Sequence, residues 1–172
     1  MYVFTQKASS ALEPTLTLAL TADERTRSRY RYSISSEITE SDCQTTNSAV
    51  GEAEPQTAEI YLQLPRGTTL RDGDCLIGDG HAQVLRIVAK PEPVMTVRTT
   101  PSDQSASTQP ALKLLQAAYH LGNRHVALEL GTDYLRLAPD SVLEAMLNQL
   151  GVMVTVETVP FQPEMGAYGH HH

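Results

Sequence analysis

Histidine is the residue type in this sequence with the clearest capacity for chemistry. The chain contains six: His81, His120, His125, His170, His171 and His172. An imidazole is largely neutral at physiological pH and offers a nitrogen donor of intermediate softness, which suits nickel, copper and zinc. Each histidine is therefore a candidate metal ligand, to be weighed against the structural role that its position predicts.

His120 and His125 lie on either side of the predicted end of a helix. For His120 the structural role is favoured, because a basic side chain stabilises the C-terminal end of a helix. His125 is expected at the start of the next strand, and its side chain need not point the same way as that of His120. His81 follows an Asp79-Gly80 turn, where an exposed polar residue is expected.

The last three residues, His170, His171 and His172, offer imidazoles with no apolar neighbours to pack against. One interpretation is a remnant of a purification tag, although three residues are fewer than such a tag usually has. We favour a flexible end that captures metal, because the run follows directly on residues 163–168, PEMGAY.

No motif of a common enzyme class occurs in the sequence. It lacks G-x-S-x-G, a P-loop, H-E-x-x-H and C-x-x-C. Residues 72–74, DGD, begin like a calcium-binding loop, but Leu76 breaks the ligand spacing. An acid–base hydrolase that used His120 or His125 would lack both a nucleophile and a pair of carboxylates. We therefore predict that the protein is not an enzyme.

The charge balance argues against another class of function. Asp and Glu total 20 against 13 for Lys and Arg, a formal net charge of −7. Proteins that neutralise phosphates need the opposite balance, so we expect no basic cluster and no nucleic-acid partner. Cys43 and Cys75 do not form a secreted disulfide scaffold. Because no signal peptide or membrane span of roughly 18 to 20 apolar residues is evident, we predict a cytoplasmic protein.

Residues 1–91 are patterned like a β domain. Alternation of polar and apolar residues predicts strands at 15–20, 30–34, 60–64, 75–77 and 84–88. The Asp79-Gly80 turn between the last two favours a hairpin, and Thr21 is expected to cap a turn or short helix. Residues 35–58 are rich in small and polar side chains and have no periodicity, so we expect an exposed, mobile insertion.

Residues 92–159 mix helices with strands. Strands are expected at 92–98, 126–130, 134–137 and 152–157. A first helix is predicted from Pro110 to about His120, with Gly122 as its stop. The order of strand, helix, strand, strand, helix and strand is that of a ferredoxin-like unit, so the predicted fold class is α+β.

The second helix of this half has its own start and stop signals. Ser141 and Glu144 form a predicted capping box, and Gly151 follows the last apolar residue of the helical stripe. Residues 99–109 are small and polar and join two patterned regions as a linker or a long loop. Residues 160–172 are expected to form a flexible tail that ends in the three histidines.

Residues 119–125, YHLGNRH, strongly resemble the signature of UreE, a family of urease accessory nickel chaperones. The likeness extends to LPRGT at 64–68, LRDGD at 70–74, VLEAML at 142–147 and PFQPEMGAY at 160–168. These segments occur in order and span most of the chain outside the expected insertion. Together they are far more specific than any one short motif.

The resemblance implies a β domain like the peptide-binding domain of Hsp40-type chaperones, followed by a ferredoxin-like metal-binding domain. It also implies a homodimer in which His125 meets its twofold mate and shares a metal. One histidine per chain cannot hold a divalent ion, whereas a twofold interface doubles every ligand on its axis. The implied partners are the urease accessory GTPase and, through it, the apo-urease complex.

We therefore predict a carrier that delivers Ni²⁺ during maturation of the urease active site. Candidate ligands are His125, the tail histidines and His120, and Cu²⁺ and Zn²⁺ are expected to compete. Residues 139–141 stand where some relatives carry further histidines, and the tail ends in three, so transfer of about one or a few ions per dimer is favoured over storage. The alternative is a protein-binding adaptor in urease assembly, in which metal regulates dimerisation.

Overall fold

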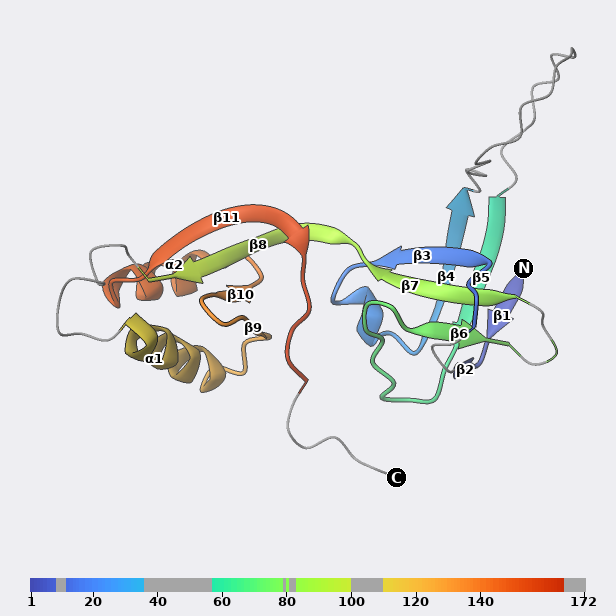
Figure 1. Ribbon diagram of the computed structural model, residues 1–172, viewed down its shortest axis with the longest axis horizontal. Helices are drawn as coiled ribbons and strands as arrows, with labels where there is room; N and C mark the ends of the chain where they lie inside the picture. The colour runs from blue at the N-terminus through green and yellow to red at the C-terminus, as the bar shows by residue number, and fades with distance from the viewer. Residues whose placement is uncertain (9–11, 36–56, 79, 81–82, 100–109, 166–172) are drawn as a thin grey trace, which may run out of the picture. The chain divides into compact units, whose positions relative to one another are not determined.

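A computed structural model describes residues 1–8, 12–35, 57–78, 80, 83–99 and 110–165 (Figure 1). The predicted mobile insertion, Cys43, His81 and the tail histidines therefore lie outside the described residues, apart from the two ends of the insertion. The chain divides into two compact units. Unit 1 contains residues 1–18 and 25–88, and unit 2 contains residues 19–24 and 89–172.

Unit 1 is built from strands, as the alternation of polar and apolar residues predicted. Its elements are β1 (Tyr2–Phe4), β2 (Gln6–Lys7), β3 (Leu16–Leu20), the 3-10 turn η1 (Glu24–Thr26), β4 (Arg29–Ser35), β5 (Thr57–Gln63), β6 (Cys75–Ile77) and β7 (Val84–Ala89). The last residues of β3 and β7 and the first residue of η1 are counted in unit 2. One sheet has the order β1-β5-β4 and the other the order β2-β6-β7-β3. Buried Phe4, Ile60, Leu62, Leu76 and Leu85 form the apolar interior.

Three sequence expectations for this region have clear outcomes. Thr21 caps η1: its hydroxyl accepts from the Glu24 amide at 3.3 Å, and its own amide donates to the Glu24 carboxylate at 2.8 Å. The predicted β6–β7 hairpin is confirmed by antiparallel pairing of Ile77 with Val84. The expected insertion is shorter than predicted, because β5 already begins at Thr57.

Unit 2 has the predicted order of elements. These are β8 (Pro91–Arg98), α1 (Pro110–Gly122), β9 (Glu129–Leu130), β10 (Leu135–Leu137), α2 (Ser141–Gln149) and β11 (Met153–Pro160). The strands form one sheet in the order β11-β8-β10-β9, and each neighbouring pair is antiparallel. The unit thus mixes helices and strands, so the α+β class is confirmed.

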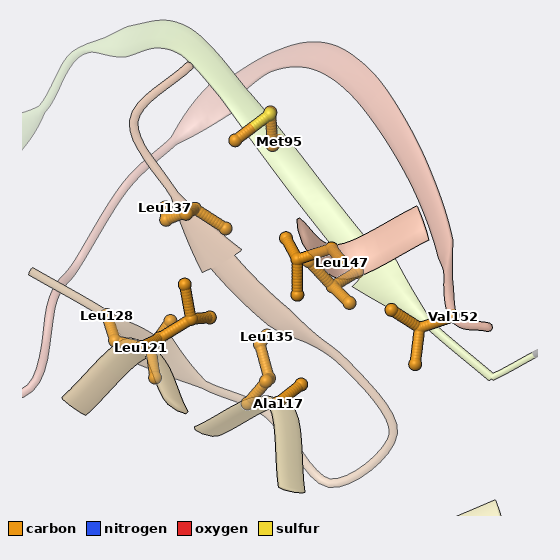
Figure 2. Packing of buried hydrophobic residues seen from close by; sticks show 9 residues of the cluster. Met95, Ala117, Leu121, Leu128, Leu135, Leu137, Leu147 and Val152 are labelled. Carbon is orange, nitrogen blue, oxygen red and sulfur yellow. The ribbon is translucent and has the colours of Figure 1, made fainter. Parts of the chain in front are cut away.

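The helices and the sheet of unit 2 share one apolar core (Figure 2). Met95 of β8 and Leu137 of β10 pack with Leu121 of α1 and Leu147 of α2, and all four are almost fully buried. Each such side chain stabilises the fold by about 1.5–3 kcal/mol relative to exposure. Because side chains alternate along a strand, β8 and β10 turn their intervening polar residues to the opposite face of the sheet.

Three local expectations for unit 2 are wrong. Helix α2 is capped by Asp140 rather than Ser141: the Asp140 carboxylate accepts from the amides of Val142 and Leu143 at 2.8 and 2.9 Å. A carboxylate at this position also favours the positive end of the helix dipole, which a serine hydroxyl does not. Strand β9 contains only two residues, and β11 extends to Pro160, which pairs with Pro91.

The first residues of the expected flexible tail are part of the folded unit 2. Pro160 belongs to β11, and the side chain of Phe161, which follows it, is buried. Residues 160–164 are thus part of unit 2, because a buried apolar side chain and hydrogen bonds from two backbone amides, those of Gln162 and Glu164, hold them. Within the described residues, no helix is both long and apolar enough to cross a membrane.

Candidate metal-binding histidines

His125 occupies an unusual backbone position at the end of α1. The amide of His125 donates to the Gly122 carbonyl at 2.9 Å, and the amide of Val126 donates to the Leu121 carbonyl at 3.3 Å. This pair of bonds defines a Schellman motif, in which the residue after the C-cap adopts a left-handed conformation. That residue is His125, with φ of 56°, and among the described residues it is the one non-glycine with positive φ.

Helix α1 ends at Gly122, as the sequence predicted, but Gly122 is not the left-handed residue of this motif. Its φ is not positive, and the helix includes it. The left-handed residue occurs three residues later, at a histidine, where glycine is the usual choice because it has no Cβ. A left-handed conformation costs a non-glycine residue roughly 1–2 kcal/mol. The fold tolerates that cost at His125.

The side chain of His125 is available to a ligand. The residue is exposed, and no hydrogen bond or ion pair joins its imidazole to another described residue. It also lies just beyond the C-terminal end of α1, where the helix dipole favours a cation by about 0.3–1 kcal/mol. The backbone therefore holds the imidazole at an exposed position that is electrostatically suited to a metal ion.

His120 has a different environment. It lies on α1, half-buried, with its ring edge-on to Tyr119 at 5.5 Å between centroids. Its carbonyl oxygen accepts from the Arg124 guanidinium at 3.0 Å, a bond that satisfies one of the last carbonyls of the helix. Among the described residues, no three His, Cys, Asp or Glu side chains gather as a metal site. His120 and His125 alone therefore do not make one.

The chain returns to the neighbourhood of His125 after β11. The amide of Gln162 donates to the Glu129 carboxylate at 2.7 Å, and the amide of Glu164 donates to the Leu128 carbonyl at 2.8 Å. With Phe161 buried, these bonds fix the segment that leads to the tail histidines.

The position of this anchor sets the reach of the tail. Leu128 is three residues from His125, which is at most about 11 Å of chain. His170 is six residues beyond Glu164, a span of up to about 21 Å. The chain from Glu164 to His170 is thus longer than the chain from Leu128 to His125.

Glu129 is held firmly enough to serve as this anchor. Its other carboxylate oxygen accepts from the Tyr134 hydroxyl at 2.9 Å and from the Arg136 guanidinium at 3.1 Å. The hydrogen bond to Glu129, with burial, raises the pKa of the Tyr134 hydroxyl. Arg136 lies directly opposite Glu129 across β9 and β10. Opposite charges on two neighbouring predicted strands are a sequence signal for such a pair, which our predictions did not include.

One face of α1 is apolar although it is exposed. Leu115 and Tyr119 are each 66% exposed and lie four residues apart, so they occupy the same face of the helix. Leu112 extends this face, and Leu130 of β9 is exposed beside a hollow of about 270 Å³ between α1 and the β9–β10 region. We call Leu112, Leu115, Tyr119 and Leu130 the apolar face. Apolar surfaces gathered in this way are typical of protein interfaces.

Gly122 continues the line of Leu115 and Tyr119, at the positions i, i+4 and i+7. A Cβ built on Gly122 meets no atom within 4 Å. Neither backbone conformation nor packing against the described residues therefore requires a glycine here, although glycine in a helix costs roughly 0.5–1 kcal/mol relative to alanine.

The chain is similar to known proteins over most of its length. Residues 92–172 match the family model described as UreE urease accessory protein, C-terminal domain. Proteins named urease accessory protein UreE are similar across both units. The one from Nostoc sp. is 48% identical over 158 residues, which is 92% of this chain and 88% of that protein.

Two further relatives with the same name cover nearly the whole chain. The protein from Thermosynechococcus vestitus is 44% identical over 173 residues, which is 99% of this chain and all of that protein. The protein from Nitrosococcus oceani is 41% identical over 174 residues, which is 100% of this chain and 86% of that protein. The similarity thus includes both the α1 end and the segment that follows β11.

Proposed function

The chain belongs to the UreE family of urease accessory proteins, and on that premise we propose that it carries Ni²⁺ to urease during maturation of the enzyme. The observation that carries the proposal is His125, an exposed imidazole held in a costly left-handed conformation at the end of α1. Residues kept in such conformations concentrate at functional sites. The nickel ion is the cargo of this site.

A single imidazole holds a divalent ion too weakly to carry it, so the site needs further ligands. We propose that two chains form a homodimer whose twofold axis passes close to His125, which supplies two imidazoles to one ion. The apolar face supports this arrangement, because its residues on α1 lie on the same side of the helix as Gly122, which precedes His125 by three residues. Gly122, which its own chain does not require, gives a second backbone room to approach.

The remaining ligands are proposed to come from the tail. His170, His171 and His172 follow the segment that hydrogen bonds to Glu129 and Leu128 hold, and Leu128 is three residues from His125. A carrier must release its ion, so its ligands are expected to bind and leave quickly. His120, half-buried on α1, is proposed as an auxiliary ligand with a smaller effect than His125.

Other features of the proposal follow from family membership and chemistry. Cu²⁺ is expected to bind at least as tightly as Ni²⁺, and Zn²⁺ to compete. We propose that the protein acts in the cytoplasm and passes nickel to the urease accessory GTPase and the apo-urease complex. We also propose that unit 1 is related to the Hsp40 peptide-binding domain and unit 2 to the ferredoxin-like fold. The strand order β11-β8-β10-β9 supports the second relationship.

Equilibrium dialysis against Ni²⁺ tests the role of His125. We expect His125→Ala to lower nickel affinity by at least about tenfold, since loss of a ligand costs no less than loss of its supporting contacts. His120→Ala is the matched control on the same helix and is expected to have a clearly smaller effect. Unchanged stoichiometry and affinity in His125→Ala would remove this residue from the site.

The same variants separate nickel carriage from the alternative, an adaptor that binds proteins and uses metal only to regulate dimerisation. Size-exclusion chromatography of the wild-type chain with the apo-urease complex, with nickel or with a chelator, measures complex formation, and a urease activity assay measures nickel transfer. A carrier is expected to activate urease in proportion to the nickel that it has bound. If His125→Ala forms the complex and supports urease activation as well as the wild type does, the adaptor is favoured.

A further inference from the structure

Strand β4 lies at an open edge of its sheet. Among the described residues it pairs only with β5, and the amide of Leu64 donates to the Ser28 carbonyl at 2.8 Å, which fixes the phase of this antiparallel pair. Because hydrogen-bonded and non-hydrogen-bonded pairs alternate, Tyr30 and Tyr32 bond toward β5. Arg29, Arg31 and Ser33 therefore direct their N–H and C=O groups away from β5. We call these three residues the β4 edge.

This edge is also the most basic part of the sequence. Four of the 13 basic residues of the chain occur at alternate positions between residues 25 and 31. Arg25 is buried, whereas Arg27, Arg29 and Arg31 are exposed. The sequence expectation that no basic cluster exists is wrong here, because a balance of charges over the whole chain hides a local concentration.

Aromatic rings hold two of these guanidinium groups. Arg31 lies over the ring of Tyr61, its cross-strand neighbour, at 5.5 Å, and Arg27 lies over the ring of Tyr30 at 4.9 Å. The Arg31 guanidinium, stacked on a ring, keeps the N–H groups at its rim for carboxylates, which it binds through two parallel hydrogen bonds. The edge thus offers backbone and side-chain donors from the same residues.

Charges on an edge strand also prevent identical chains from pairing edge to edge. That effect bears on which partner fits. Two copies of β4 would bring arginines opposite arginines, which disfavours a second copy as the occupant. An incoming strand with carboxylates at alternate positions places opposite charges directly across from Arg29 and Arg31, on the face that carries the Tyr61 ring.

We propose that the β4 edge binds an extended acidic segment of another protein as an added strand. Backbone hydrogen bonds to Arg29, Arg31 and Ser33 provide the pairing, and alternate Asp or Glu side chains provide the selectivity. This interaction uses no metal and no histidine. It therefore goes beyond nickel carriage, and each can fail without the other.

Fluorescence anisotropy with a labelled probe tests the proposal. The probe is an eight-residue peptide that alternates Glu with Val, measured with the full-length chain in a buffer that contains a chelator. We expect saturable binding that weakens with added salt. The double variant Arg29→Glu, Arg31→Glu is expected to bind about tenfold more weakly, because it reverses two charges across the strand pair.

Two controls separate strand addition from general attraction. Arg66→Glu with Arg86→Glu makes the same change of charge at exposed sites of unit 1, with Arg86 on the central strand β7, and is expected to bind as the wild type does. Ser33→Pro removes an amide from the open edge without a change of charge. It is expected to weaken binding severalfold while the β4–β5 ladder remains.

Three results would overturn the proposal. The first is equal weakening by the Arg66 and Arg86 control, which would show non-specific attraction. The second is a Ser33→Pro variant that folds and binds as the wild type does, which would exclude strand addition. The third is failure of the wild type to bind the probe. This holds even if a variant without residues 37–55 binds the probe, because the β4 edge would then be occupied by the acidic segment of its own chain.

Discussion

The two helices of unit 2 end with the same backbone motif but with different residues at its critical position. In α2 the amide of Gly151 donates to the Asn148 carbonyl and that of Val152 to the Leu147 carbonyl, at 3.0 and 3.4 Å. Gly151 then has φ of 74°. In α1 the equivalent residue is His125, with φ of 56°. Helix α2 thus ends with the residue that folding stability favours, whereas α1 ends with a residue that lowers folding stability.

We interpret this difference as a loss of folding stability at the end of α1 in exchange for a metal ligand. Glycine adopts positive φ without a steric penalty, whereas histidine does so less readily and loses stability. A histidine at the end of α1 places an exposed imidazole at the negative end of the helix dipole. In our account the metal site is built on the same turn that stops the helix, so the position of the ligand is fixed by main-chain hydrogen bonds.

The largest effect is expected when the end of α1 is blocked from a second chain. Gly122→Leu adds bulk next to the apolar face, and we expect it to weaken the nickel-bound dimer by more than about tenfold. Asn148→Leu makes a similar change on the exposed last turn of α2 and is the matched control. Sedimentation equilibrium with nickel measures both. Equal dimerisation of Gly122→Leu and wild type would contradict the proposed interface.

A second prediction breaks the end of α2. Gly151→Ala forces a Cβ into a left-handed conformation, and we expect it to lower the free energy of unfolding by about 1 kcal/mol. Gly122→Ala, at a helical position with open space around it, is expected to leave stability unchanged or raise it. Urea denaturation in the presence of a chelator measures both variants. A destabilised Gly122→Ala would mean that Gly122 has a role within its own chain.

A third prediction concerns the anchor beyond β11. Glu129→Ala removes the acceptor of the Gln162 amide, and we expect faster hydrogen exchange at that amide and about twofold weaker nickel binding, since a longer free tail lowers the local concentration of histidine. Glu144→Ala on α2 is the control. Unchanged exchange at Gln162 would show that buried Phe161 suffices as the anchor.

The smallest effect is expected on the polar face of the sheet. A hydrogen bond from the Thr96 hydroxyl, assisted by Arg136 and Arg98, lowers the pKa of Glu157 below its ordinary value of 4.5. A lowered folded-state pKa contributes stability above the unfolded-state value, and that stability is lost as pH falls through the folded-state pKa.

Thr96→Val is therefore expected to raise the pKa of Glu157 and to reduce the pH dependence of stability in the acid range. Thr155→Val, whose hydroxyl donates to the Thr96 carbonyl instead, serves as its control. Carboxyl-carbon NMR titration measures the pKa in both variants. An unchanged pKa of Glu157 in Thr96→Val would exclude the hydrogen bond as its main cause.

The sequence predicted the elements of unit 2 well, because its helices and strands carry clear periodic signals. It was less accurate at their ends. Helix α1 does stop at Gly122, as predicted, but the left-handed turn is at His125, because the choice between nearby positions depends on the tertiary path of the chain. Ser141 looked like a cap, but Asp140 precedes it and binds two amides.

The candidate site was predictable only in part. A short motif that resembled a known family pointed to His125, but no pattern in the sequence predicted its backbone conformation. The anchor that brings residues 162–164 beside Leu128 joins segments more than 30 residues apart, and such contacts leave no local signal. The arginines of the β4 edge were visible, but only their alternation, rather than the total charge, indicated a surface.

The most direct test of this account is the single substitution His125→Gly, followed by two measurements on the same protein. We expect urea denaturation with a chelator to show a free energy of unfolding that is higher by about 0.5–1 kcal/mol, because glycine relieves the left-handed strain. We expect nickel affinity in equilibrium dialysis to fall by at least about tenfold. A variant that is less stable than the wild type, or that binds nickel equally well, would contradict the claim that this turn trades stability for a metal ligand.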